Sequence, residues 1–178
     1  MRWAVMASAV AGLAPRAGGI PETQPVPSPH QDPKHYLDWL KTNLAEGPQQ
    51  QRNEAAERLI EIGSTEAHNA ITAGLSANDE RTQYACAKAI ADHGAPDPDW
   101  RNLLVALLGR DRPPSEPAAR ALGRYDGDDV AYRALIRFAQ GRQASARLPA
   151  IHALGQVVQK PVAEALVGIV SDAAEDPA

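Results

Sequence analysis

The sequence contains a single cysteine and few aromatic residues. Cys86 is the only cysteine among 178 residues, which excludes an intrachain disulfide and any zinc or haem site built on several cysteines. Tryptophan, tyrosine and phenylalanine number 3, 4 and 1, too few for strands that alternate aromatic and β-branched side chains. No apolar run is long enough to form a permanent membrane-spanning helix. A chain of this length and composition predicts one all-α domain.

Positive charge is also scarce over most of the chain. The formal net charge is −4, which argues against a general nucleic-acid-binding protein, because such proteins are normally basic. Residues 101–150 are the exception, with nine arginines against five acidic residues. The central part of the chain is therefore predicted to carry local positive charge.

The amino terminus has the layout of an exported protein. Residues 1–14 contain one arginine followed by about a dozen mostly apolar residues and then small ones, which predicts a signal peptide. The alternative is a cytoplasmic protein with a disordered start or a misassigned initiation codon. Residues 15–33 contain six prolines and predict a semi-extended linker, because proline lacks an N–H and fixes φ.

The remainder of the chain is organised by a repeat. The segment 52–63 recurs at 83–94, 115–126 and 147–158, with starts 31, 32 and 32 residues apart. Small residues and branched aliphatic residues four positions later fall in aligned columns and share one helical face. We expect these columns to form the core; they are Ala55, Cys86, Ala118 and Ala150, followed by Leu59, Ile90, Leu122 and Leu154.

A second apolar-periodic stretch follows each copy of the repeat. Turn residues separate the stretches, and Ser64 and Asp128 are predicted N-caps. A further helix at about 35–45 is predicted to cap the first unit. Residues 34–171 thus predict a right-handed α-solenoid of about four helix pairs, nine helices in all, before an acidic tail at 172–178. The second helices are expected at 67–75, 100–108, 130–139 and 162–170.

These columns resemble the HEAT repeat, an armadillo-type fold, and in particular its short alanine-rich bacterial variety related to the bilin lyases. The unit of that family is roughly an arginine, two variable residues, two alanines, a variable residue and Ala-Leu-Gly, and residues 147–155 and 115–123 match it closely. The first two copies depart from it, with Ile60 and Ala91 in place of the glycine. The resemblance implies an α-solenoid whose second helices line a concave surface that holds a protein partner.

Residues able to do chemistry are few and scattered. Cys86 lies in the alanine column, which indicates a small buried apolar residue. No two histidines have metal-ligand spacing, although stacked repeats could bring two together, and His93 is expected to be half-buried. Asp126, Asp128 and Asp129 indicate a turn with an N-cap more than a calcium loop. We therefore expect no metal, no cofactor and no catalytic residues.

The central arginines give the most informative functional signal. Arg133 and Arg137 are one helical turn apart, and the repeat register places Arg101 near the position of Tyr132. We hypothesise that Arg101, Tyr132, Arg133 and Arg137 form a basic patch for an acidic protein partner. The opposing interpretation is a solvated helix face whose arginines offset nearby carboxylates.

The sequence favours a non-catalytic interaction scaffold, since each repeat of a solenoid adds binding surface without needing a pocket. One alternative is an auxiliary enzyme subunit of lyase type that acts on a modified protein or a chromophore. A third interpretation, a nucleic-acid-binding HEAT-like protein, is disfavoured by the acidity and the shortage of aromatics.

Overall fold

Helices are the regular secondary structure of the chain wherever its structure is described. The computed structural model describes residues 32–94, 96–110, 113–142, 144–156 and 167–168, which contain no strand. The predicted all-α class is therefore confirmed. No helix in these ranges is long and apolar enough to cross a bilayer. The helices are α1 (Pro33–Glu46), α2 (Gln49–Ile62), α3 (Thr65–Ser76), α4 (Glu80–His93), α5 (Pro98–Leu108), α6 (Ser115–Leu122), α7 (Asp129–Gln140) and α8 (Ala144–Gly155).

Several predicted segments lie outside the described residues. The predicted signal peptide at 1–14, the linker as far as residue 31 and the tail at 172–178 are among them. Of the predicted ninth helix at 162–170, only Val167 and Gly168 are described, and both are helical.

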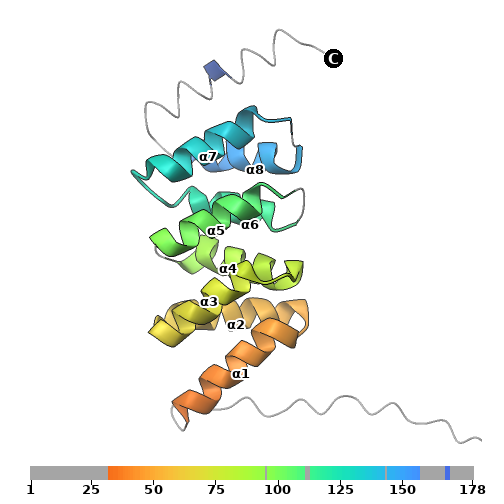
Figure 1. Ribbon diagram of the computed structural model, residues 1–178, viewed down its shortest axis with the longest axis vertical. Coiled ribbons are helices and arrows are strands. Elements are labelled where there is room, and N and C mark those ends of the chain that lie inside the picture. Colours follow the sequence, from red (N-terminus) through yellow and green to blue (C-terminus); the bar gives the residue numbers. More distant parts are fainter. Residues whose placement is uncertain (1–31, 95, 111–112, 143, 157–166, 169–178) are drawn as a thin grey trace, which may run out of the picture.

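The helices stack as two parallel rows (Figure 1). In one row α2, α4, α6 and α8 pack successively against each other, and in the other row the same holds for α1, α3, α5 and α7. Across the rows, α1 packs against α2, α3 against α4, α5 against α6 and α7 against α8, and α3 also contacts α2 and α7 also contacts α6. Each repeat of the sequence thus contributes one helix to each row, as α2 and α3, α4 and α5, or α6 and α7, and α1 lies at one end of the stack (Figure 1). This solenoid-like arrangement is the one that the repeat predicted.

The ends of the helices follow from capping residues. Ser64 accepts a hydrogen bond from the N–H of Ala67, and Asp128 accepts from Val130 and Ala131, so both predicted N-caps are confirmed. Gly63 ends α2 with φ of 61°, a left-handed conformation that favours glycine. Helix α1 starts at Pro33, which the sequence pattern placed in the linker. Proline suits the first turn because the N–H it lacks has no partner there, and Asp32 caps the helix.

The core is built from the predicted columns. Ala55, Cys86, Ala118 and Ala150 are all at most 2% exposed, and the Leu or Ile four residues later is buried in every copy. Short side chains in α2, α4, α6 and α8 let these helices approach closely, while the branched residues fill the space between them. The packing proposal on which the solenoid rests is therefore confirmed.

Helices α3 and α4 come especially close where a glycine faces the cysteine. A Cβ atom on Gly74 would lie only 2.5 Å from Sγ of Cys86. Burial raises the pKa of the Cys86 thiol to about 12, as expected for a cysteine that acts as a small apolar residue. The expectation for His93 is wrong: this last residue of α4 is exposed, because side chains at a helix end have fewer neighbours.

Candidate functional site

Arg101, the first residue of the predicted basic patch, joins two successive repeats. Its Nη1 atom lies 2.8 Å from Oδ2 of Asp128, the N-cap of α7. Partial burial raises the pKa of Asp128. The hydrogen bond from Arg101 and the positive charge of that arginine lower it by more, so the pKa of Asp128 lies below its ordinary value. The charge of Arg101 is thus already balanced by a carboxylate.

Tyr132 is buried beneath the turn between α6 and α7. Its hydroxyl donates a hydrogen bond to Oδ1 of Asp126 at 3.0 Å and accepts one from the N–H of Gly127 at 2.8 Å. Gly127 has φ of 74°, so the turn uses a conformation that few other residues adopt. Tyr132 therefore holds this turn in place.

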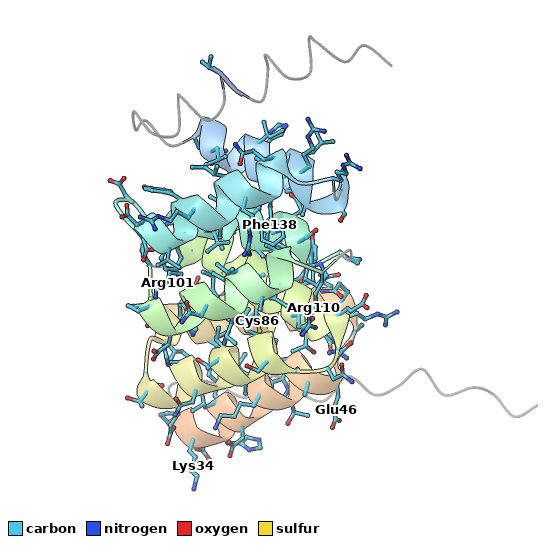
Figure 2. The ribbon with its side chains drawn as sticks, turned by 45° about the horizontal axis from the view of Figure 1, so that its top comes forward. Lys34, Glu46, Cys86, Arg101, Arg110 and Phe138 are labelled. Carbon is cyan, nitrogen blue, oxygen red and sulfur yellow. The ribbon has the colours of Figure 1, made fainter. Side chains whose placement is uncertain are left out.

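Arg133 and Arg137 lie one turn apart and point into solvent. The side chain of Arg133 is 83% exposed, and the carboxylate of Asp129 is 3.8 Å away and equally exposed. The guanidinium of Arg137 lies 4.8 Å from the centre of the Phe138 ring. That ring packs beneath the end of α5, where a Cβ on Gly109 would lie 3.2 Å from Phe138 Cζ. We call Arg133 and Arg137 the α7 arginine surface. Figure 2 labels Phe138, which follows Arg137 in the chain.

The α7 arginine surface belongs to a stretch without acidic residues. Residues 130–156 contain four arginines, at 133, 137, 142 and 147, and no aspartate or glutamate. By contrast, Lys88 in α4 contacts Glu57 and Asp92 at 3.0 and 2.8 Å, and Arg120 in α6 contacts Asp92 at 2.8 Å. Positive charge is therefore concentrated at the α7–α8 end of the described stack.

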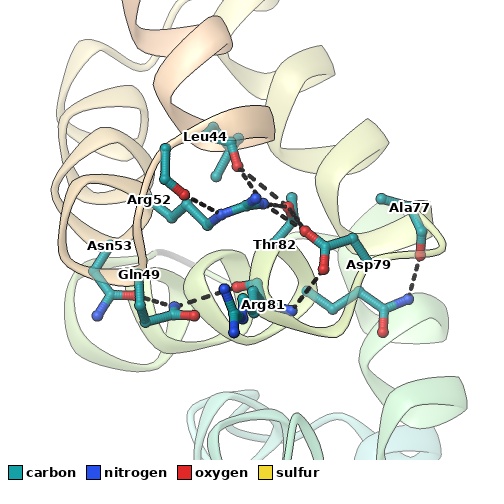
Figure 3. Close-up of polar contacts among 10 residues, drawn as sticks. Leu44, Gln49, Arg52, Asn53, Ala77, Asp79, Arg81 and Thr82 are labelled. Carbon is teal, nitrogen blue, oxygen red and sulfur yellow. Dashed lines mark hydrogen bonds and ion pairs between the residues drawn. The ribbon is translucent and has the colours of Figure 1, made fainter. Parts of the chain in front are cut away.

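A second polar network links α1, α2 and α4 (Figure 3). Arg52 is only 8% exposed, and its guanidinium donates hydrogen bonds to Asp79, to Thr82 and to the carbonyls of Leu44 and Gly47. The hydroxyl of Thr82 also bonds to Asp79 and is the main cause of the lowered pKa of that carboxyl. This buried arginine fixes the capping helix α1 to the first repeat.

A groove of about 550 Å³ lies beside this network, between α1, α3 and α4. Small apolar side chains form most of its wall, with charged groups at its edge. The lining residues are Lys41, Leu44, Ala45, Glu66, Asn69, Ala70, Ala73, Gly74, Ala77, Asp79 and Thr82.

A third polar cluster was missed by sequence reasoning. His68 on α3, Asp97 before α5 and Asp99 in the first turn of α5 offer three donor atoms that lie within 4.8 Å of one another. Nε2 of His68 is 2.9 Å from Oδ2 of Asp97. We call these three residues the His68 cluster. Two of them, His68 and Asp97, border a cavity of about 210 Å³ that Trp100 also lines. Histidine spacing could reveal only pairs of histidines, whereas the partner here is an N-cap aspartate.

The repeat register contained the signal that would have revealed this cluster. His68 and Arg101 are each the fourth residue of α3 and α5, and each contacts the N-cap aspartate of the next second helix. Asp97 and Asp128 are therefore equivalent positions, and aligning the caps as well as the apolar columns would have paired them with their partners.

The comparisons with known proteins identify no family for this chain. No protein-family model matches the sequence, and no curated protein shows significant similarity to it.

Proposed function

We propose that the protein is a non-catalytic interaction scaffold of HEAT-repeat type that uses the α7 arginine surface to bind an acidic segment of a protein partner. The observation that carries this proposal is the contrast in charge between α7 and the helices that precede it in the stack. Arg133 and Arg137 project from one helix face in a stretch with no acidic residue after Asp129, whereas Lys88 and Arg120 are paired with carboxylates.

The geometry of the two arginines supports an acidic partner. Guanidinium groups bind carboxylates with two parallel hydrogen bonds, and groups one turn apart can engage successive acidic side chains. Neither arginine has to break a buried contact to do so, because Arg133 is almost fully exposed and Arg137 rests on a ring. Hydrogen bonds of Tyr132 and Asp128 fix the start of α7 to the turn before it. The surface is therefore rigid, which lowers the entropic cost of binding.

The two other predicted patch residues take a supporting role in this proposal. Arg101 balances Asp128, and Tyr132 fixes the turn before α7, so neither has to contact the partner. The binding surface is then narrower than the patch of four residues that the sequence suggested.

A charge-reversal experiment tests the proposal. A fluorescent glutamate-rich peptide is titrated with the full chain and with the double variant Arg133→Glu, Arg137→Glu, at low and at physiological salt. We expect a loss of affinity of about tenfold, since two favourable exposed contacts become repulsive. Added salt should weaken binding to the unmodified chain more than to the variant.

The matched control is Arg58→Glu, Arg81→Glu, which changes net charge by the same amount at exposed residues of α2 and α4. An equal loss of affinity in this control would show that only overall charge matters and would refute the proposal. Tighter binding of duplex DNA or RNA than of the peptide would point to a nucleic-acid partner instead.

A further inference from the structure

The His68 cluster has the composition and spacing of a metal site. It contributes one imidazole nitrogen and two carboxylate oxygens from two different repeats, all within 4.8 Å of one another. We propose that His68, Asp97 and Asp99 bind a divalent transition-metal ion, with Zn²⁺ the ion that best suits this mixed nitrogen and oxygen set. This site lies apart from the α7 arginine surface and does not depend on the function proposed for it.

His68 and Asp97 need to move very little to admit the ion. Two ligands of a tetrahedral zinc lie about 3.3 Å apart, since each bond is about 2.0–2.1 Å long. Nε2 of His68 and Oδ2 of Asp97 are 2.9 Å apart, so they need to separate by only about 0.4 Å. The adjoining cavity of about 210 Å³ provides room for water as a further ligand. The side chains of His68 and Asp97 are 28% and 29% exposed, which leaves a path for the ion to enter.

Asp97 can bind metal without giving up its structural role. Its Oδ1 atom accepts a hydrogen bond from the N–H of Asp99 and caps α5, while Oδ2 faces His68. The two oxygens of one carboxylate therefore serve two purposes. The partial positive charge at the start of α5 disfavours a cation there, and the negative charges of Asp97 and Asp99 offset this effect.

Surrounding residues hold the ligands in position. The His68 ring stacks on Trp100 with centroids 4.8 Å apart, and the indole N–H donates to Thr72 at 2.9 Å. The hydroxyl of Tyr125 accepts from the N–H of Asp97 and donates to its carbonyl. Outer contacts that orient the ligands are typical of metal sites in proteins.

The alternative role of His68 is purely structural, as the counterpart of Arg101. In the next repeat Arg101 contacts Asp128 just as His68 contacts Asp97. The variant His68→Arg separates the two roles, because arginine keeps an ion pair with the N-cap aspartate but cannot serve as a metal ligand.

The experiment uses Co²⁺ as a spectroscopic substitute for Zn²⁺. In a Trp3→Phe, Trp39→Phe background, Trp100 is the only tryptophan and stacks on the proposed ligand. We expect Co²⁺ to quench its fluorescence and Zn²⁺, but not Mg²⁺, to reverse the quenching. His68→Arg and Asp99→Asn should each weaken this Co²⁺ binding by about tenfold or more. Zn²⁺ should raise the melting temperature of the unmodified chain and leave that of His68→Arg unchanged.

Two other exposed histidines provide the control, through His93→Ala, His152→Ala. Absence of quenching would overturn the proposal. So would quenching that survives His68→Arg, or quenching that the control variant abolishes. Because Asp99 is exposed and neither caps α5 nor packs in the core, Asp99→Asn still tests the metal site if His68→Arg folds poorly.

Discussion

The guanidinium of Arg52 on α2 donates a hydrogen bond to the carboxylate of Asp79, the residue that caps α4. This pair connects neighbouring helices of one row, and the same guanidinium also bonds to the last turn of α1 through the Leu44 carbonyl. Arg52 is the arginine that opens the first copy of the repeat. Its position in the repeat therefore has a structural reason.

Replacing Arg52 by methionine should destabilise the whole stack. The apolar stem is retained, but Asp79 and two backbone carbonyls each lose a hydrogen bond from the guanidinium, at a cost of about 2–3 kcal/mol. Urea unfolding followed by circular dichroism measures this cost. Arg58→Met on the exposed side of the same helix is the control, and it should change the free energy of unfolding far less. Equal effects of the two variants would contradict a structural role for the buried network.

Gly74→Ala should destabilise the protein although alanine favours helices. The added Cβ would lie 2.5 Å from Sγ of Cys86 and force α3 away from α4, at a cost of about 1–3 kcal/mol. The double variant Gly74→Ala, Cys86→Ala removes the sulfur and should be more stable than Gly74→Ala alone. A double-mutant cycle measures the coupling. Simple additivity of the two changes would show that the two helices do not meet at this point.

Cys86 should be inert in the native protein. Its thiol is buried, and its pKa of about 12 leaves only about one thiolate in ten thousand at pH 8. We expect Ellman's reagent to label no thiol in the folded chain and one thiol per chain in urea. Rapid labelling without denaturant would mean that α4 is exposed to solvent.

Stability should fall in acid. The pKa values of Asp79, Asp92 and Asp128 are lowered in the folded state. An unfolded aspartate has a pKa of about 3.9, so the unfolded chain binds protons first as the pH falls. The stabilisation is thus complete above about pH 5 and is lost progressively below about pH 4. Urea unfolding at pH 7, 4 and 3 measures this loss.

Asp128→Asn provides the internal test of that pH dependence. Asparagine is as good an N-cap as aspartate but does not titrate. The variant should be less stable at neutral pH, because Arg101 loses its partner, and should lose less stability between pH 5 and 3. The same acid sensitivity in the variant and the unmodified chain would rule out Asp128 as a contributor.

The repeat could be recognised in the sequence because its core is built from residues at short, regular spacings. Ala118 and Leu122 are four residues apart, and on a helix this spacing alone places them on one face. The cap at Asp128 and the stop at Gly63 are equally local, since each depends on residues within one turn. Helix α6 ends at Leu122, before the end of the repeat copy at residue 126. This end was harder to predict, because neighbouring helices decide how far a helix continues.

The candidate sites were less predictable, since they depend on distances between repeats. Arg101 and Arg133 both belonged to the predicted patch, yet Arg101 pairs with Asp128 while Arg133 projects into solvent. His68 and Asp97 are 29 residues apart and meet only because α3 and α5 are adjacent in one row.

By itself, the sequence determined the helices, the period of the repeat and the residues that fill its interior, because apolar burial acts through a spacing that repeats along the chain. Only the tertiary structure decided which charged and polar groups are neutralised and which face solvent. Those contacts depend on the offset between stacked helices, and that offset is set by the packing of side chains from separate repeats.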